Sequence, residues 1–230
     1  MLANDNRGKY VIILFYVAII YHIAHLMKAK GLEMPRHITF SGNGSKVLNI
    51  LSTNNLTLIQ FTKLIFEEIY SQKYPADGLE IIRPANSKES TCKGGILLTP
   101  FQSQDYSKIE EMKTVLIGSD NEKFADGMTY NNISESDLSQ VVETIKDYIE
   151  LTFSIDKKFS FYNNFDIDRS IMDKVKQLCY RDIRTYLENG ITLKKDEITQ
   201  DGADDKLEET LFFYPLVGII NAVVRTIYQM

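Results

Sequence analysis

The residues best suited to chemistry form a glycine turn. Ser41, Gly42, Asn43 and Gly44 interrupt an apolar, β-forming run, and Ser45 and Lys46 open the apolar-periodic segment that follows. Two glycines around an asparagine permit backbone angles closed to other residues and let a ligand approach the main chain. Ser45 is a good N-cap, so the first helical amides would point back into the loop. Such a turn accepts phosphate or the polar edge of a nucleotide, although it also suits a plain tight connection.

Two other groups of residues could bind a cation, but their spacing favours simpler roles. His22 and His25 lie three residues apart in an apolar segment, with no nearby Cys, Asp or Glu to complete a metal site, so we expect satisfied core histidines. Asp201, Asp204 and Asp205 do not match the alternating ligands of an EF-hand loop, and we expect a solvated loop. We therefore predict no metal site and no catalytic residue.

The composition is that of an ordinary globular chain. The chain has 230 residues, 44% hydrophobic and 25% charged, which suits one large domain or a domain with a helical appendage. A net charge of −5 argues against a general nucleic-acid surface, and the sequence shows no basic stripe with interleaved aromatic residues. Cys92 and Cys179 lie far apart, so we expect reduced thiols and a cytoplasmic location.

Before the glycine turn lies a long apolar segment, Lys9–Lys30. Its run Val11–Met27 carries no charge, and a helix that is apolar on every face is either buried or in a membrane. The run is short for a bilayer span. We expect a core helix packed between a sheet and other helices, ended by Gly31 as a C-cap. A membrane anchor, formed by this run or by Leu211–Tyr228, is the alternative.

The residues around the turn predict an α/β arrangement. The strand His37–Phe40 is followed by a short helix from Ser45 to Leu51 and by an amphipathic helix that the capping box Thr57–Gln60 opens. A second strand, Leu79–Ile82, precedes a third helix, Lys88–Leu98. Helical crossovers join parallel strands. A nucleotide would then lie outside the carboxyl end of the first strand.

These motifs resemble a known superfamily. The stretch Ile38-Thr39-Phe40-Ser41-Gly42-Asn43-Gly44-Ser45-Lys46-Val47-Leu48 is similar to the adenosine motif of the actin, sugar-kinase and heat-shock-chaperone ATPases. Asn43 departs from the glycine pattern, and Lys46 stands where the chaperones have an arginine beside the adenine. Glu89 and Gly94 match the acidic and glycine positions of the family's connect helix. The resemblance implies that Gly42, Asn43, Gly44, Ser45 and Lys46 bind ATP or ADP.

Other parts of that superfamily have no counterpart in this chain. The phosphate-binding hairpin with its Asp-x-Gly-Thr-like turn is missing, and so is the second phosphate motif. The resemblance implies that these parts hold the magnesium ion and position the attacking water. We therefore expect residues 1–100 to be the C-terminal half of an actin-like nucleotide-binding lobe, not catalytic alone. The partner would be the remainder of a larger ATPase or another chain.

Residues 101–230 are predicted to form a mainly helical extension with a short β-hairpin. The hairpin would pair Thr114–Ile117 with Phe124–Ile133, and Ser134 with Asp137 would cap the next helix. Two further helices are predicted, Asp166–Asn189, and Leu207–Tyr228 with a kink at Pro215. Their apolar stripes suit a core or a protein partner. A non-catalytic scaffold that keeps an actin-like fold, and a membrane-associated protein, are the alternative functions.

Overall fold

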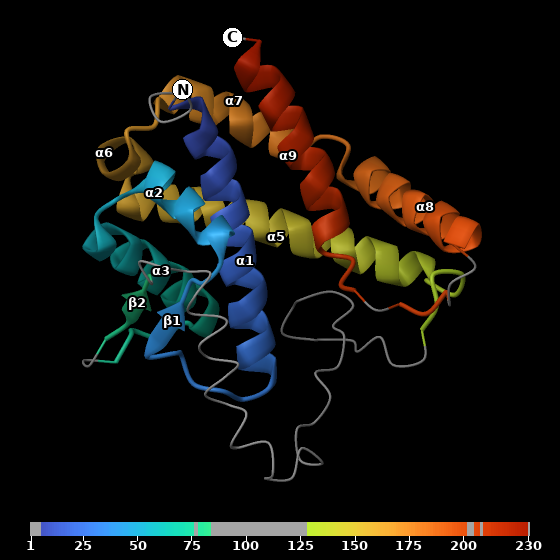
Figure 1. Ribbon diagram of the computed structural model, residues 1–230, viewed down its shortest axis with the longest axis horizontal. Helices are drawn as coiled ribbons and strands as arrows, with labels where there is room; N and C mark the ends of the chain where they lie inside the picture. Colours follow the sequence, from blue (N-terminus) through green and yellow to red (C-terminus); the bar gives the residue numbers. More distant parts are fainter. Residues whose placement is uncertain (1–5, 76–77, 84–127, 202–204, 208, 230) are drawn as a thin grey trace.

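The computed structural model describes residues 6–75, 78–83, 128–201, 205–207 and 209–229. Its first part contains α1 (Arg7–Ala29), β1 (His37–Thr39), the 3₁₀ helix η2 (Asn43–Val47), α2 (Leu48–Leu51), α3 (Asn55–Tyr70) and β2 (Glu80–Ile82). Its second part contains α5 (Glu135–Phe159), α6 (Phe161–Phe165), α7 (Arg169–Cys179), α8 (Ile183–Asp201) and α9 (Phe213–Tyr228). Figure 1 shows helices on both sides of α1, with the two strands beside its lower half.

The apolar helix α1 runs through the centre of the molecule, as predicted. The Tyr148 hydroxyl of α5 donates a hydrogen bond to the Leu14 carbonyl at 2.7 Å, and the hydroxyls of Tyr16 and Thr62 lie 2.5 Å apart. Gly31 ends the helix with a φ of +66°, a conformation that favours glycine. Within the described residues α1 is also the one helix long and apolar enough to cross a membrane, and 56% of its most apolar window is buried.

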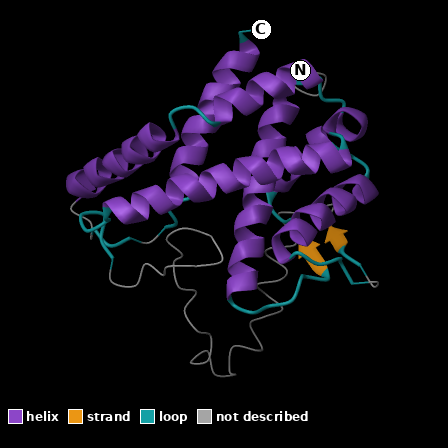
Figure 2. Ribbon diagram, turned by 180° about the vertical axis from the view of Figure 1, so that it is seen from behind, coloured by secondary structure: helices purple, strands orange, loops and turns teal. Residues whose placement is uncertain are grey.

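The two strands pair in parallel, which confirms the predicted pairing and the helical crossover. His37, Ile38 and Thr39 lie opposite Glu80, Ile81 and Ile82, and η2, α2 and α3 make the connection. The strands are the orange arrows in Figure 2, with helices covering one side. Over the described residues the fold is therefore α/β in this small unit and helical elsewhere.

The helix α3 begins at Asn55, earlier than the predicted start at Thr57. Asn54 has an extended backbone, and its side-chain oxygen accepts a hydrogen bond from the Leu56 amide at 2.9 Å. The expected capping box Thr57–Gln60 therefore lies inside α3, and its role as the start of the helix was predicted wrongly. Asn54 fits better because its own amide is held by the Ser52 hydroxyl at 3.1 Å, which fixes the turn before the helix.

The predicted helix Asp166–Asn189 is two helices in the structure. Asp182, with a φ of +54°, separates α7 from α8. The second helix does not stop at Asn189 but continues to Asp201. Gly190 is needed inside it because a Cβ atom there would lie 2.8 Å from the Cβ atom of Tyr214. The glycine marks a close helix contact rather than a helix end.

The last helix is shorter than expected and begins later in the sequence. α9 begins at Phe213, so Pro215 lies in its first turn, where proline is tolerated because an amide at this position would have no partner within the helix. Leu207 instead donates its amide to the Met128 carbonyl at 2.8 Å. Thr129 pairs antiparallel with Lys206. The first strand of the predicted β-hairpin, Thr114–Ile117, lies outside the described residues. So do the predicted helix Lys88–Leu98 and the predicted boundary between the two parts of the chain at residue 100.

The capping box of α5 is confirmed. The Asp137 amide donates to the Ser134 hydroxyl oxygen at 3.2 Å, and the Asp137 carboxylate accepts the Ser134 amide at 3.0 Å. This helix and its neighbours α7 and α9 share one hydrophobic cluster with α1 and α3. The first and last described helices meet at their ends, where the Arg7 guanidinium lies 4.8 Å from the ring centre of Tyr228.

Candidate functional site

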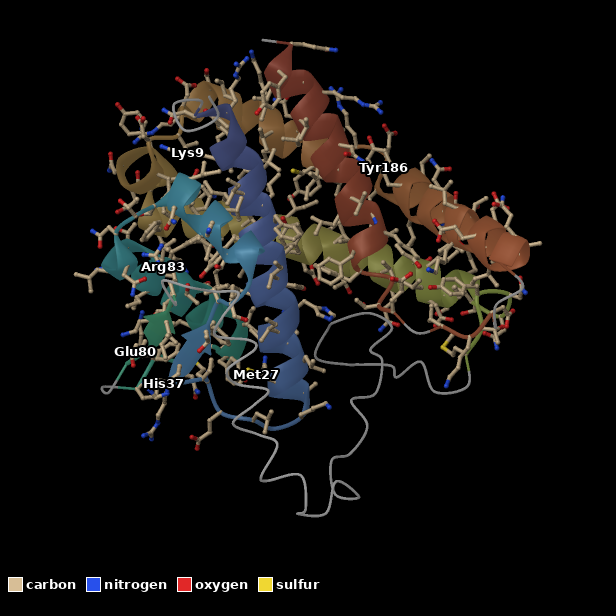
Figure 3. The ribbon with its side chains drawn as sticks, in the orientation of Figure 1. Lys9, Met27, His37, Glu80, Arg83 and Tyr186 are labelled. Carbon is tan, nitrogen blue, oxygen red and sulfur yellow. The ribbon has the colours of Figure 1, made fainter. Side chains whose placement is uncertain are left out.

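The glycine turn lies at the carboxyl end of β1, and Arg83 follows directly at the carboxyl end of β2. Because the two strands are parallel, both features lie at the same end of the sheet, the carboxyl end. Figure 3 shows Arg83 at this end and the exposed pair His37 and Glu80, whose side chains lie 3.4 Å apart, at the opposite end. Parallel sheets bind ligands at the carboxyl ends of their strands.

Gly42 is the conformational centre of the turn. Its φ of 79° and ψ of 168° lie in a region that is essentially restricted to glycine. Its carbonyl accepts two hydrogen bonds from Ser45, one from the amide at 3.2 Å and one from the hydroxyl at 2.8 Å. Ser45 is therefore not the N-cap that we predicted. η2 begins at Asn43, so the amides of Asn43 and Gly44 have no carbonyl partner inside this helix.

The remaining turn residues are accessible. Gly44 and Lys46 are exposed and Ser45 is half-buried. A Cβ atom placed on Gly44 would meet no described atom within 4 Å, so a ligand has room to approach this backbone. The five predicted binding residues are consecutive, with Gly42 before η2 and the other four within it, while Glu89 and Gly94 of the second motif lie outside the described residues.

Arg83 is a site residue that the sequence pattern did not reveal. Its guanidinium donates to the side-chain oxygen of Asn49 at 3.0 Å and to the carbonyls of Ser52 and Thr53 at 3.4 and 3.2 Å. All three acceptors are neutral, so within the described residues no carboxylate offsets its charge. The signal in the sequence was its position directly after the second strand. Because β2 pairs in parallel with β1, a residue that follows β2 lies near the turn that follows β1.

A groove of about 600 Å³ runs from this turn along β1 and α1. Its walls are mainly apolar. α1 supplies one wall with Ile12, Phe15, Ile19, Ile23 and Met27, and the strand and the turn supply the other with residues 37–41, 44 and 45. Phe40 also contacts the Tyr16 ring, with the ring centres 5.9 Å apart. The polar backbone of the turn therefore stands at one end of an apolar channel.

The two histidines of α1 are half-buried beside the core rather than in it, and a ring nitrogen of His22 is not satisfied by a hydrogen bond from the described residues. His22 stacks on Phe212 and meets Phe213 edge-on, with ring centres 5.6 and 5.3 Å away. Its buried Nδ1 has no hydrogen-bond partner among the described residues. Burial, aided by repulsion from His25, lowers the pKa of His22 to about 4. No cluster of three or more His, Cys, Asp or Glu residues that could hold a metal occurs in the described parts of the chain.

Comparison of the chain with protein-family models, with curated proteins and with solved structures gives no match. The geometry of the turn and its surroundings therefore carries the functional interpretation.

Proposed function

We propose that this chain supplies the adenosine-binding turn of an actin-like ATPase lobe. The observation that supports this most strongly is the position of the glycine turn, at the carboxyl end of a strand whose parallel partner is reached through a helical crossover. The proposal also rests on the likeness of residues 38–48 to the adenosine motif. The phosphate-binding hairpin, the magnesium ligands and the group that positions water would come from the remainder of the ATPase.

The turn has groups that suit a nucleotide. The amides of Asn43 and Gly44 are donors without a partner in η2, and the space around Gly44 lets a ligand reach them. Lys46 and Arg83 add positive charge at the same carboxyl end of the sheet, where phosphate oxygens would be attracted. When it binds, ATP brings the reactive phosphoryl group. The residues of this chain would bind and orient the adenosine rather than break a bond.

Calorimetric titration of the chain with ADP tests the proposal. We expect weak binding, with a Kd of about 1 mM, because a few backbone hydrogen bonds give only about −4 kcal/mol. Gly44→Val should abolish the heat of binding, since the new side chain fills the space in front of the amides. The unfolding midpoint should stay unchanged, because that space is open in the described structure.

A surface variant provides the control for this titration. Leu193 is 65% exposed on α8, away from the sheet edge, and Leu193→Lys should bind ADP as the unaltered chain does. Equal heats for the unaltered chain and Gly44→Val would reject the turn as the binding site. Absence of binding even when a phosphate-binding half is added in the same solution would reject the nucleotide itself.

A non-catalytic scaffold with the same fold is the second candidate function. The apolar groove beside the turn favours it, because contiguous exposed apolar surface marks sites of protein interaction. Under this alternative, Gly44→Val would change no ligand affinity, and the groove would be the functional surface.

A further inference from the structure

One edge of β1 is open in the described structure. The Arg36 carbonyl accepts the Glu80 amide at 2.8 Å, and the Phe40 amide donates to the Ile82 carbonyl at 3.0 Å. Because backbone groups alternate in direction along a strand, the groups of His37 and Thr39 face away from β2. No described residue hydrogen-bonds to them. The strand thus presents two amides and two carbonyls in the spacing of a sheet edge.

The apolar groove runs along this open edge. Phe15, Ile19 and Ile23 recur every four residues on α1 and therefore share one face of the helix. Phe15 is 45% and Ile23 is 40% exposed. Opposite them, Ile38 and Phe40 of the strand region are half-buried and pack against the core. A strand placed beside β1 would cover this face of α1 with every second side chain.

The two-sided apolar character of α1 has the same explanation. Its inner face is buried, with Leu14, Val17, Ala18 and Ala24 fully inside. Its outer face is apolar too, although water now reaches it. A helix that is apolar on both faces should be covered on both. Parallel sheets likewise are covered on both faces, and sheets most commonly have about four to six strands.

We propose that an extended segment from the remainder of the ATPase adds to β1 as a third strand. Its backbone would accept from and donate to His37 and Thr39, and its apolar side chains, at every second position, would fill the groove against Phe15 and Ile23. The identity of the donor rests on the proposed function, but the pairing itself requires no nucleotide. The occupant is a strand rather than a lipid surface because an open edge needs hydrogen-bond partners, which hydrocarbon does not offer.

A synthetic peptide of alternating valine and threonine, with lysine at both ends, tests the pairing with the full chain. Hydrogen exchange of the His37 and Thr39 amides, followed by NMR, should slow by about tenfold when the peptide saturates the edge. A peptide in which proline replaces alternate threonines should give no protection, because it cannot pair as a strand. Equal protection by both peptides would reject strand addition.

Three variants separate edge pairing from unspecific adhesion. Phe15→Lys should abolish the protection, whereas Leu193→Lys, an exposed site on α8, should retain it. Thr39→Pro removes one donor of the open edge and leaves the ladder to β2 intact, so it should weaken binding relative to Thr39→Val. Protection that persists in Phe15→Lys would reject the groove. Protection without peptide, rising with chain concentration, would assign the edge to a second copy and reject a partner strand.

The strand proposal and the nucleotide proposal fail separately. Lys46 lies outside the groove walls. Lys46→Ala should weaken ADP binding and leave the peptide-induced protection of Thr39 unchanged. If the chain binds the peptide but not ADP, the strand proposal stands and the nucleotide proposal is rejected. If it binds ADP but not the peptide, the nucleotide proposal stands and the strand proposal is rejected.

Discussion

Gly218 and Tyr186 touch so closely that no side chain fits between them. A Cβ atom on Gly218 would lie 2.2 Å from Cγ of Tyr186. The contact is reciprocal, because Gly190 on the other helix meets Tyr214 in the same way. Figure 3 shows Tyr186 where α8 approaches α9. Each helix therefore offers a glycine to receive the tyrosine of its neighbour, and this pair of contacts fixes how α8 and α9 cross.

Replacing the glycine at this crossing should destabilise the fold. We expect Gly218→Ala to lower the free energy of unfolding by about 2 kcal/mol, because the added methyl group forces the Tyr186 ring to move. Urea unfolding measures the change. Gly8→Ala in α1 is the matched control, since no described atom lies within 4 Å of its added Cβ atom, and it should be stabilising by about 0.5 kcal/mol. Similar values for the two variants would contradict the close contact.

The two glycines of the turn should respond differently to alanine. Gly42→Ala should lower the free energy of unfolding by about 1 to 3 kcal/mol, because alanine is strained at a φ of 79° and a ψ of 168°. Gly44→Ala should change stability by less than about 0.5 kcal/mol, as expected for an unhindered surface position. Thermal unfolding of both variants checks this. A larger loss for Gly44→Ala than for Gly42→Ala would contradict the open space around Gly44 and the special backbone conformation of Gly42.

Stability should fall as the pH falls through the range set by His22. The pKa of His22 is about 4 in the folded chain and about 6.5 when unfolded. Between these values the unfolded state binds the extra proton, so stability is full above pH 6.5 and declines toward pH 4, by about 3 kcal/mol at most. Carboxylates titrate in the lower part of this range, and His22→Phe serves to subtract them. A His22→Phe chain with the same pH dependence as the unaltered chain would exclude this origin.

The break between α7 and α8 makes a separate prediction. Because Asp182 has a φ of +54°, glycine should be tolerated better than alanine at this position. Asp182→Gly should unfold with a free energy about 1 kcal/mol higher than Asp182→Ala. Guanidinium titration compares the two. A continuous helix from residue 166 to residue 189 would reverse the order, since alanine is then the better residue.

The parts of the fold that the sequence predicted well have strong local signals. The uncharged run of α1, the Ser134 capping box and the position of the glycine turn after β1 are each specified within a few residues, although the helix after the turn begins at Asn43 and not at Ser45. The parallel pairing of β1 with β2 followed from the helical residues between them. In the site, the same locality explains why Gly42 through Lys46 could be named in advance as one turn.

The features that were missed depend on residues distant in sequence. Gly190 resembles a helix end until Tyr214 of another helix is placed against it, and Pro215 resembles a kink until the start of α9 is known. Arg83 gains its place in the site only when β2 lies beside β1. The open edge of β1 also has no sequence signature, because it is defined by which backbone groups the neighbouring strand uses.

The central claim is that the turn after β1 binds adenosine through its main chain. Titration of the ¹⁵N-labelled chain with ADP, followed by NMR, tests it most directly. We predict that the amide signals of Gly42, Asn43, Gly44, Ser45 and Lys46 shift progressively, and that Gly44→Val removes these shifts in a chain that remains folded. Chemical-shift changes confined to α8 and α9 would contradict the claim. So would turn amides whose signals do not change with ADP in a chain that is folded.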